Sequence, residues 1–188
     1  MKVKDEKASI WTLPNRLSIL RILFIPIIIF FIASQDEKLV FASGLLFIIA
    51  GITDGLDGYM ARRMGLTSRL GVYLDPIADK LLVASVLITL TYFRMVPLWV
   101  TILLVAREFI INGLRSFYAI EGIIIYPSFA GKLKTFLQII GIAFILFSPY
   151  SRYLYQPGIY IIYGALFFSL YSAYRYVYAM FKHKDTVP

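Results

Sequence analysis

Long apolar runs separated by short polar breaks dominate the hydropathy pattern of this chain. They fall at about 17–34, 39–61, 71–93, 96–118, 130–148 and 157–181. Each run is close to the roughly 20 residues that an α-helix needs to cross a bilayer. The breaks carry proline, serine and charged residues typical of loops, and all are too short to form a domain outside the membrane. We therefore expect an all-α integral membrane protein with six transmembrane helices, in which residues 1–188 form a single domain.

The residues before the first run fit either an interfacial helix or a signal peptide. Lysines precede an apolar stretch that ends at Ala33-Ser34, as in many signal peptides. Arg21 and Pro26 interrupt that stretch, however, and more apolar runs follow. We favour a short interfacial helix over residues 2–13, with Trp11 near the membrane entry.

Composition excludes an ordinary soluble protein and several kinds of site. Hydrophobic residues make up 60% of the chain and charged residues 16%, against about 25% charged residues in soluble domains. Cysteine is absent, which excludes disulfides, thiolate metal sites and cysteine nucleophiles. The one histidine, His183, lies in a charged tail and is expected to be solvated rather than catalytic.

The distribution of basic residues predicts an orientation. Sixteen lysines and arginines lie at the two termini, in the 62–70 and 119–129 loops, or at the adjoining helix ends, whereas Lys38, Arg94 and Arg152 lie on the opposite side. Because cytoplasmic loops are enriched in lysine and arginine, both termini are expected in the cytoplasm. The net charge of +8 is then explained by basic residues that set the orientation and attract anionic lipid or phosphate, rather than by binding of nucleic acid.

Four aspartates lie within one 26-residue stretch between apolar segments: Asp54, Asp57, Asp75 and Asp79. One carboxylate at mid-membrane costs roughly 2.5–3.5 kcal/mol, so a cluster needs a neutralising partner. Residues three or four apart share a helix face, and two antiparallel helices can point both pairs into one pocket. Oxygen ligands suit Mg²⁺ or Mn²⁺, and such rings commonly hold two ions about 4 Å apart around a phosphoryl group.

Small and basic residues accompany the aspartates. We assign Gly51 and Gly55 to helix packing, whereas Gly58 and Gly71 lie beside the carboxylates, where a bare backbone admits a bulky ligand. Arg62 offers a permanent planar cation for a phosphate, although an arginine at this place also fits the inside-positive pattern.

The complete spacing is Asp54-x2-Asp57-Gly58-x2-Ala61-Arg62-x8-Gly71-x3-Asp75-x3-Asp79. With every fixed position occupied, the chain resembles the CDP-alcohol phosphotransferases, and the likeness extends over its whole length. Segments 13–21, 74–80, 107–115 and 131–138 look like those of the family's bacterial phosphatidylglycerophosphate synthases. The resemblance implies transfer of a phosphatidyl group from CDP-diacylglycerol to sn-glycerol 3-phosphate, with release of CMP. It also implies phospholipid biosynthesis by a homodimer in the cell (inner) membrane, with the active site facing the cytoplasm.

The resemblance implies roles for individual residues. Asp79 matches the base that activates the acceptor hydroxyl and also a metal ligand, beside Asp54, Asp57 and Asp75 as ligands. The expected CDP-lipid site comprises Asn15, Ser18, Arg21, Gly58, Arg62, Ser68 and Gly71. A doubly charged acceptor needs cations of its own, and the candidates are Arg107, Arg115, Lys132 and Lys134. Lys132 and Lys134 diverge by about 200° on one helix, so both are not expected to reach one ligand.

Other functions remain open from the residues alone. Inositol phosphate, serine or a second phosphatidylglycerol are alternative acceptors on the same scaffold. An intramembrane prenyltransferase also uses aspartate pairs and Mg²⁺, but it needs more helices. A transporter would spread its carboxylates through the bilayer depth and show an inverted repeat, which is not visible here. The remaining aromatic residues, including Tyr171, Tyr174, Tyr176 and Tyr178, are expected to face lipid or the interface.

Overall fold

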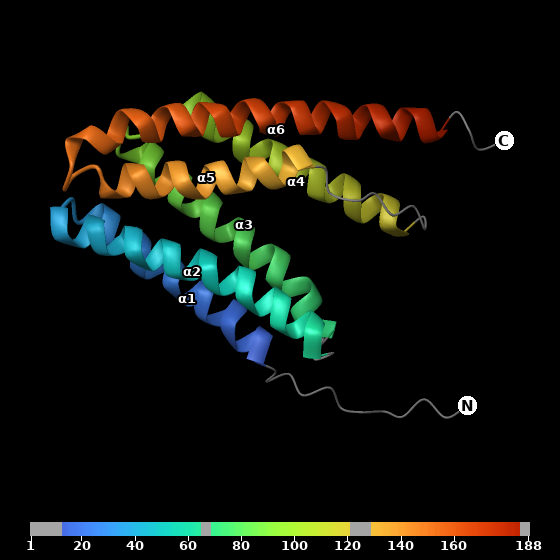
Figure 1. Ribbon diagram of the computed structural model, residues 1–188, viewed down its shortest axis with the longest axis horizontal. Coiled ribbons are helices and arrows are strands. Elements are labelled where there is room, and N and C mark those ends of the chain that lie inside the picture. Colours follow the sequence, from blue (N-terminus) through green and yellow to red (C-terminus); the bar gives the residue numbers. More distant parts are fainter. Residues whose placement is uncertain (1–12, 65–68, 121–128, 185–188) are drawn as a thin grey trace. The chain divides into compact units, whose positions relative to one another are not determined.

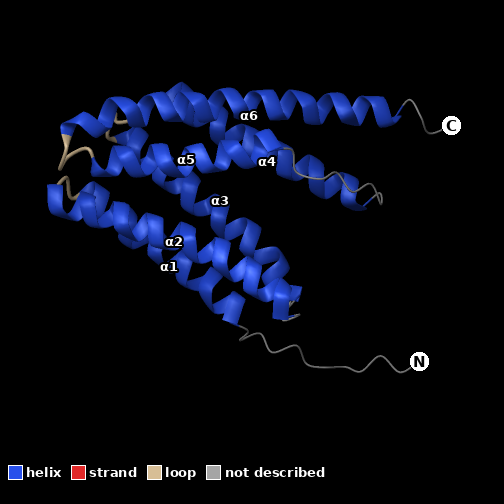
Figure 2. Cartoon of the chain, in the orientation of Figure 1, coloured by secondary structure: helices blue, strands red, loops and turns tan. Residues whose placement is uncertain are grey.

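The computed structural model describes residues 13–64, 69–120 and 129–184, with side chains for 18–52, 77–118 and 129–178. Over these ranges the chain is helical apart from short turns, and no strand occurs in them (Figures 1 and 2). The helices are α1 (Leu13–Ala33), α2 (Glu37–Met64), α3 (Arg69–Tyr92), α4 (Leu98–Ile120), α5 (Phe129–Phe147) and α6 (Tyr155–Lys184), with a 3-10 turn η1 (Arg152–Leu154) before α6. The chain divides into two compact units, residues 1–86 and 87–188, and α3 runs from the first into the second.

The six helices expected from the apolar runs are confirmed, with ends within four residues of the expected positions. The observed helix ends differ from the ends of the apolar runs where polar residues continue a helix. For example, α2 extends through Arg62 and Arg63 to Met64, because backbone hydrogen bonds rather than apolar side chains define where a helix ends. The expected interfacial helix over 2–13 falls, apart from Leu13, outside the described residues.

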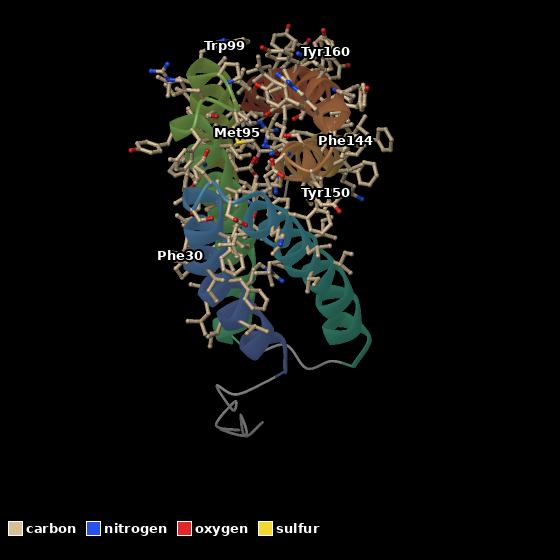
Figure 3. All side chains as sticks on the ribbon, turned by 90° about the vertical axis from the view of Figure 1, so that its left-hand side faces the viewer. Phe30, Met95, Trp99, Phe144, Tyr150 and Tyr160 are labelled. Atoms are coloured by element: carbon tan, nitrogen blue, oxygen red, sulfur yellow. The ribbon has the colours of Figure 1, made fainter. Side chains whose placement is uncertain are left out.

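The surface of the helices is consistent with a membrane protein. Among the described residues, one helix, α5, is long and apolar enough to cross a membrane, judged by its length and composition alone. Ser18–Ala33 form a shorter apolar stretch. Large apolar side chains are exposed in both units, such as Phe30 in α1 and Ile102 in α4. Figure 3 shows Trp99 and Tyr160 on the outside of the second unit, where they are mostly exposed. Exposed apolar surface of this extent suits a lipid environment. Six membrane spans and cytoplasmic termini stay predictions.

In the first unit, α1 packs along α2, as Figure 1 shows. The buried apolar side chains of these two helices include Ile28 and Ile32 on α1 and Val40, Phe47 and Ala50 on α2. The Asp36 carboxylate caps α2 by accepting hydrogen bonds from the Lys38 and Leu39 backbone amides at 3.0 and 3.1 Å. A Cβ on Gly51 would meet no described atom within 4 Å, so the close packing expected there is not found with any described residue.

In the second unit, α5 and α6 pack closely and α4 also packs on α6. Gly141 and Gly158 allow the α5–α6 approach: a Cβ on Gly158 would lie 2.9 Å from Ile145 Cγ1 and 3.2 Å from the Gly141 carbonyl oxygen. Small residues permit this in membrane helices because backbones can come near one another. The close α5–α6 pair, with α4 packed on α6, forms the scaffold of the basic cluster described below for the second unit.

Candidate functional site

The four aspartates of the motif lie on two consecutive helices of the first unit. Asp54 and Asp57 belong to α2, and Asp75 and Asp79 belong to α3. The helical backbone therefore gives each pair the shared face that its spacing predicts. Of the four side chains, the structure describes that of Asp79, which is half-buried and has an interaction partner. Convergence of all four on one pocket stays a prediction.

Two of the residues expected to bind the CDP-lipid are buried in α1. Ser18 and Arg21 are each 2% exposed. The Arg21 Nε donates a hydrogen bond of 3.1 Å to the carbonyl oxygen of Ala50 on α2. Ala50 precedes Asp54 by one helical turn, and a helix carbonyl points toward the next turn. The Arg21 guanidinium is therefore held at the turn of α2 where the aspartate motif begins.

The other residues expected to bind the CDP-lipid are only partly described. Asn15 lies on α1, Gly58 and Arg62 lie on α2, and Gly71 lies on α3, but their side-chain surroundings fall outside the described part of the chain. Ser68 falls outside the described residues altogether. Their role in nucleotide binding stays a prediction.

The second unit contains a basic cluster whose centre is Arg107 on α4. The Arg107 Nε donates to the carbonyl oxygen of Ser169 on α6 at 3.1 Å, and its Nη2 donates to the Ser172 hydroxyl. Its Nη1 lies 3.5 Å from the Glu108 carboxylate. All three nitrogens of this guanidinium are thus engaged within the protein. Arg107 therefore fastens α4 to α6.

Lys134 and Lys132 on α5 point in different directions, as their spacing predicts. The Lys134 side chain is 2% exposed and its Nζ forms an ion pair with the Glu108 carboxylate on α4. Lys132, by contrast, is exposed. A buried ammonium is costly without a counter-ion, so the pairing with Glu108 explains how Lys134 is tolerated inside the unit. Of the two lysines, Lys134 belongs to the buried cluster.

Arg115, two turns after Arg107 on α4, is held differently. Its Cζ lies 5.9 Å from the centroid of the Tyr176 ring, in a cation–π arrangement. Its Nε is buried and has no hydrogen-bond partner in the described part of the chain. The same holds for Asn112 Nδ2 and the Tyr176 hydroxyl. Buried polar atoms normally have partners, so this group can receive a polar ligand or water.

The expectation that Tyr176 faces lipid is wrong. Tyr176 is 9% exposed and packs against Ile111 on α4, whereas Tyr171, Tyr174 and Tyr178 are exposed as expected. The reason is helical geometry, because Ser169, Ser172 and Tyr176 follow one another at three and four residues and so share a face of α6. Sequence reasoning missed this polar stripe, although its spacing in an otherwise apolar helix is a readable signal. It also left the role of Glu108 as a counter-ion unassigned.

The described side chains do not by themselves make a metal centre. No cluster of three or more histidine, aspartate or glutamate side chains occurs among those the structure describes. Three of the four aspartate side chains of the motif lie outside that set. Carboxylate oxygens paired on two helices nevertheless have the donor chemistry that Mg²⁺ or Mn²⁺ requires.

Comparison with known proteins agrees with the motif. A family model described as CDP-alcohol phosphatidyltransferase matches residues 11–171. One similar protein, from Rickettsia bellii, is 40% identical over 91% of this chain and 96% of its own length. Relatives from Bacillus subtilis and Escherichia coli K12 are 35% and 34% identical, over 88% and 90% of this chain and 93% and 94% of their own lengths. All three are named CDP-diacylglycerol–glycerol-3-phosphate 3-phosphatidyltransferase. Because the matched residues include the whole aspartate motif and the basic residues of α4 and α5, the chain belongs to the CDP-alcohol phosphatidyltransferase family.

Proposed function

We propose that this protein transfers the phosphatidyl group of CDP-diacylglycerol to sn-glycerol 3-phosphate, giving phosphatidylglycerophosphate and CMP in phospholipid biosynthesis. The observation that carries the proposal is the complete aspartate motif on α2 and α3. It is supported by relatives named for this activity that align over nearly their whole lengths. We treat residues 1–188 as one functional domain, because the family model spans both compact units.

Asp79 is the proposed general base. In the reaction, the acceptor hydroxyl oxygen forms a bond to the phosphorus that carries the lipid, and the bond from that phosphorus to CMP breaks. The hydroxyl is a poor nucleophile until its proton is removed, and the Asp79 carboxylate takes that proton. The half-buried place of Asp79 on α3 supports this role, because such a side chain is held in position yet stays within reach of a substrate.

Asp54, Asp57, Asp75 and Asp79 are the residues proposed to hold Mg²⁺ or Mn²⁺, as a pair of ions. When bound, the ions supply neutralisation of the charge on the attacked phosphoryl group and on the leaving phosphate oxygens. The donor set fits this assignment, because four carboxylates in an apolar chain repel one another unless cations neutralise them.

The proposed CDP-lipid site includes Asn15, Ser18, Arg21, Gly58, Arg62, Ser68 and Gly71. Support from the described side chains comes from Arg21, which is buried and held at the Ala50 turn just before Asp54. A fixed guanidinium at that level suits a diphosphate, because it supplies permanent charge and several parallel donors.

Arg115 is the proposed direct ligand of the acceptor phosphate, and Arg107 and Lys134 complete the cationic cluster. The proposal rests on the difference in their contacts: Arg115 Nε has no partner among the described residues, whereas Arg107 is fastened to α6 by Ser169 and Ser172. Lys132 is exposed and is assigned to the rim of this site, where it attracts the anion from solution.

We further propose that the six helices span the cell (inner) membrane with both termini and the active site on the cytoplasmic side, and that the protein is a homodimer. The distribution of lysine and arginine supports the orientation. The extensive exposed apolar surface of α1, α2, α4 and α6 supports placement in lipid.

The direct test is an acceptor panel with purified protein in detergent. CDP-diacylglycerol and Mg²⁺ are supplied with glycerol 3-phosphate, inositol phosphate or serine in separate reactions, and released CMP is measured. We expect CMP release that depends on glycerol 3-phosphate and exceeds that with the other acceptors. Preference for another acceptor overturns the glycerol phosphate assignment, and absence of CMP with every acceptor overturns the transferase assignment.

A further inference from the structure

Glu108 occupies a central place in the basic cluster of the second unit. It lies on α4, and its side chain is 23% exposed. One oxygen, Oε2, accepts from the buried Lys134 ammonium on α5 and also lies 3.5 Å from Arg107 Nη1. Arg107 in turn binds Ser169 and Ser172 on α6. A chain of polar contacts therefore links α5 to α4 and α4 to α6, and Glu108 is the link to α5.

The charge of this cluster is suited to a particular anion. Arg107, Arg115 and Lys134 carry three positive charges and Glu108 carries one negative charge, which leaves a net charge of +2. A phosphate monoester at neutral pH carries about −1.5 to −2 charges, whereas a phosphodiester carries only one. Glu108 is the one counter-ion in this set of four side chains, and without it the set would contain three cations and no negative charge.

We propose that Glu108 is a positioning residue for the acceptor, holding the Lys134 ammonium and the Arg107 guanidinium so that the cluster receives a phosphate monoester dianion. The inference rests on the proposed function, since it assigns a role within the acceptor site. A lysine side chain has four rotatable bonds and would otherwise lose that freedom only when the acceptor binds. Fixing it in the folded protein removes that cost from the binding step.

Two other roles for the Glu108 carboxylate predict different effects of its neutralisation on substrate binding. If Glu108 only competed with the acceptor phosphate for Lys134, then its neutralisation would tighten acceptor binding. If Glu108 only stabilised the fold, then its neutralisation would affect the donor and the acceptor alike. A positioning role predicts weaker acceptor binding with donor binding retained.

The test compares Glu108→Gln with wild type in detergent, using CMP release at varied glycerol 3-phosphate and, separately, at varied CDP-diacylglycerol. Loss of one charge-assisted contact predicts a rise of about 10-fold or more in the KM for glycerol 3-phosphate. The KM for CDP-diacylglycerol should stay within about twofold. Glu108→Asp keeps the charge and should recover part of the acceptor affinity. Glu37→Gln, which neutralises an exposed acid at the start of α2, is the matched control and should change neither KM.

A double-mutant cycle tests whether Glu108 acts through Lys134. Lys134→Met removes the ammonium, and adding Glu108→Gln to it should raise the acceptor KM by less than Glu108→Gln does alone, because the contact shared by the two changes is already lost and only the Glu108 contact with Arg107 remains to be removed. Isothermal titration with glycerol 3-phosphate gives the same comparison without turnover. An unchanged or lowered acceptor KM in Glu108→Gln, additive effects in the cycle, or equal rises for both substrates would overturn the proposal. If wild type releases no CMP with any acceptor, then the proposed function itself has failed, and the titration still tests the cluster.

Discussion

Arg115→Ala is expected to weaken acceptor binding selectively. The Nε of Arg115 has no hydrogen-bond partner in the described part of the chain, so the substitution breaks no internal hydrogen bond at that atom. What it removes is the proposed charge-assisted contact to the acceptor phosphate, and such a contact contributes about 1.5–3 kcal/mol. At about 1.4 kcal/mol for each tenfold change, the KM for glycerol 3-phosphate should rise by roughly 10–150-fold.

The structure also predicts what Arg115→Ala leaves intact. The one described contact that is lost is the cation–π contact with Tyr176, which contributes roughly 0.5–2 kcal/mol. The variant should therefore fold and bind CDP-diacylglycerol normally. Arg107→Ala differs, because it breaks contacts with Ser169, Ser172 and Glu108. We expect it to lower the free energy of unfolding as well as acceptor affinity.

The assay measures CMP release at varied glycerol 3-phosphate with saturating CDP-diacylglycerol, and then with the two roles exchanged. Thermal unfolding in the same detergent reports stability. Arg115→Lys should be intermediate, since it keeps the charge but not the planar donors. Arg152→Ala, at an exposed arginine of η1, is the control and should match wild type. Equal effects of Arg115→Ala on both substrates would refute the reasoning and mark Arg115 as structural. No effect on either substrate would also refute it and would leave Arg115 as one of the basic residues that set the membrane orientation.

Four further outcomes are expected. Chelation by excess EDTA should abolish CMP release, and added Mg²⁺ or Mn²⁺ should restore it; full turnover under chelation would contradict the metal assignment. Asp79→Asn should lower kcat by about 10²–10⁴-fold, the usual contribution of a general base, with CDP-lipid affinity largely kept. More than about a tenth of wild-type turnover would be incompatible with that role. Arg62→Ala should raise the KM for CDP-diacylglycerol and leave that for glycerol 3-phosphate unchanged, which the same two titrations measure. Gly158→Ala should destabilise the protein by about 1–3 kcal/mol in thermal unfolding, because its Cβ would lie 2.9 Å from Ile145 Cγ1 and 3.2 Å from the Gly141 carbonyl oxygen. Gly164→Ala is its control, with the nearest described atom at 4.0 Å, and a similar loss in both would disprove the packing argument.

The helices and the chemistry of the aspartate motif could be predicted from the sequence. Apolar runs of membrane length set the six helices, and polar or proline-containing breaks set their ends to within a few residues. The motif needed no structure either, because four carboxylates at helical spacing with Gly58 and Arg62 define a family by residue type and distance along the chain. The divergence of Lys132 and Lys134 also followed from helix geometry alone.

The partners of the charged residues, by contrast, were decided by the tertiary structure. The pairing of Glu108 with Lys134 joins positions 26 residues apart on different helices, and Arg107 finds its acceptors on α6 more than 60 residues away. Tyr176 shows the reason most clearly, because hydropathy gave the same value to a tyrosine facing lipid and to one buried against Ile111. In a membrane protein both the lipid-facing and the protein-facing sides of a helix are apolar, so the hydrophobic pattern fixes where a helix lies along the chain but not how it is rotated. That rotation is set by packing, by close contacts such as Gly141 with Gly158 and by buried ion pairs, and it determines which polar side chains meet.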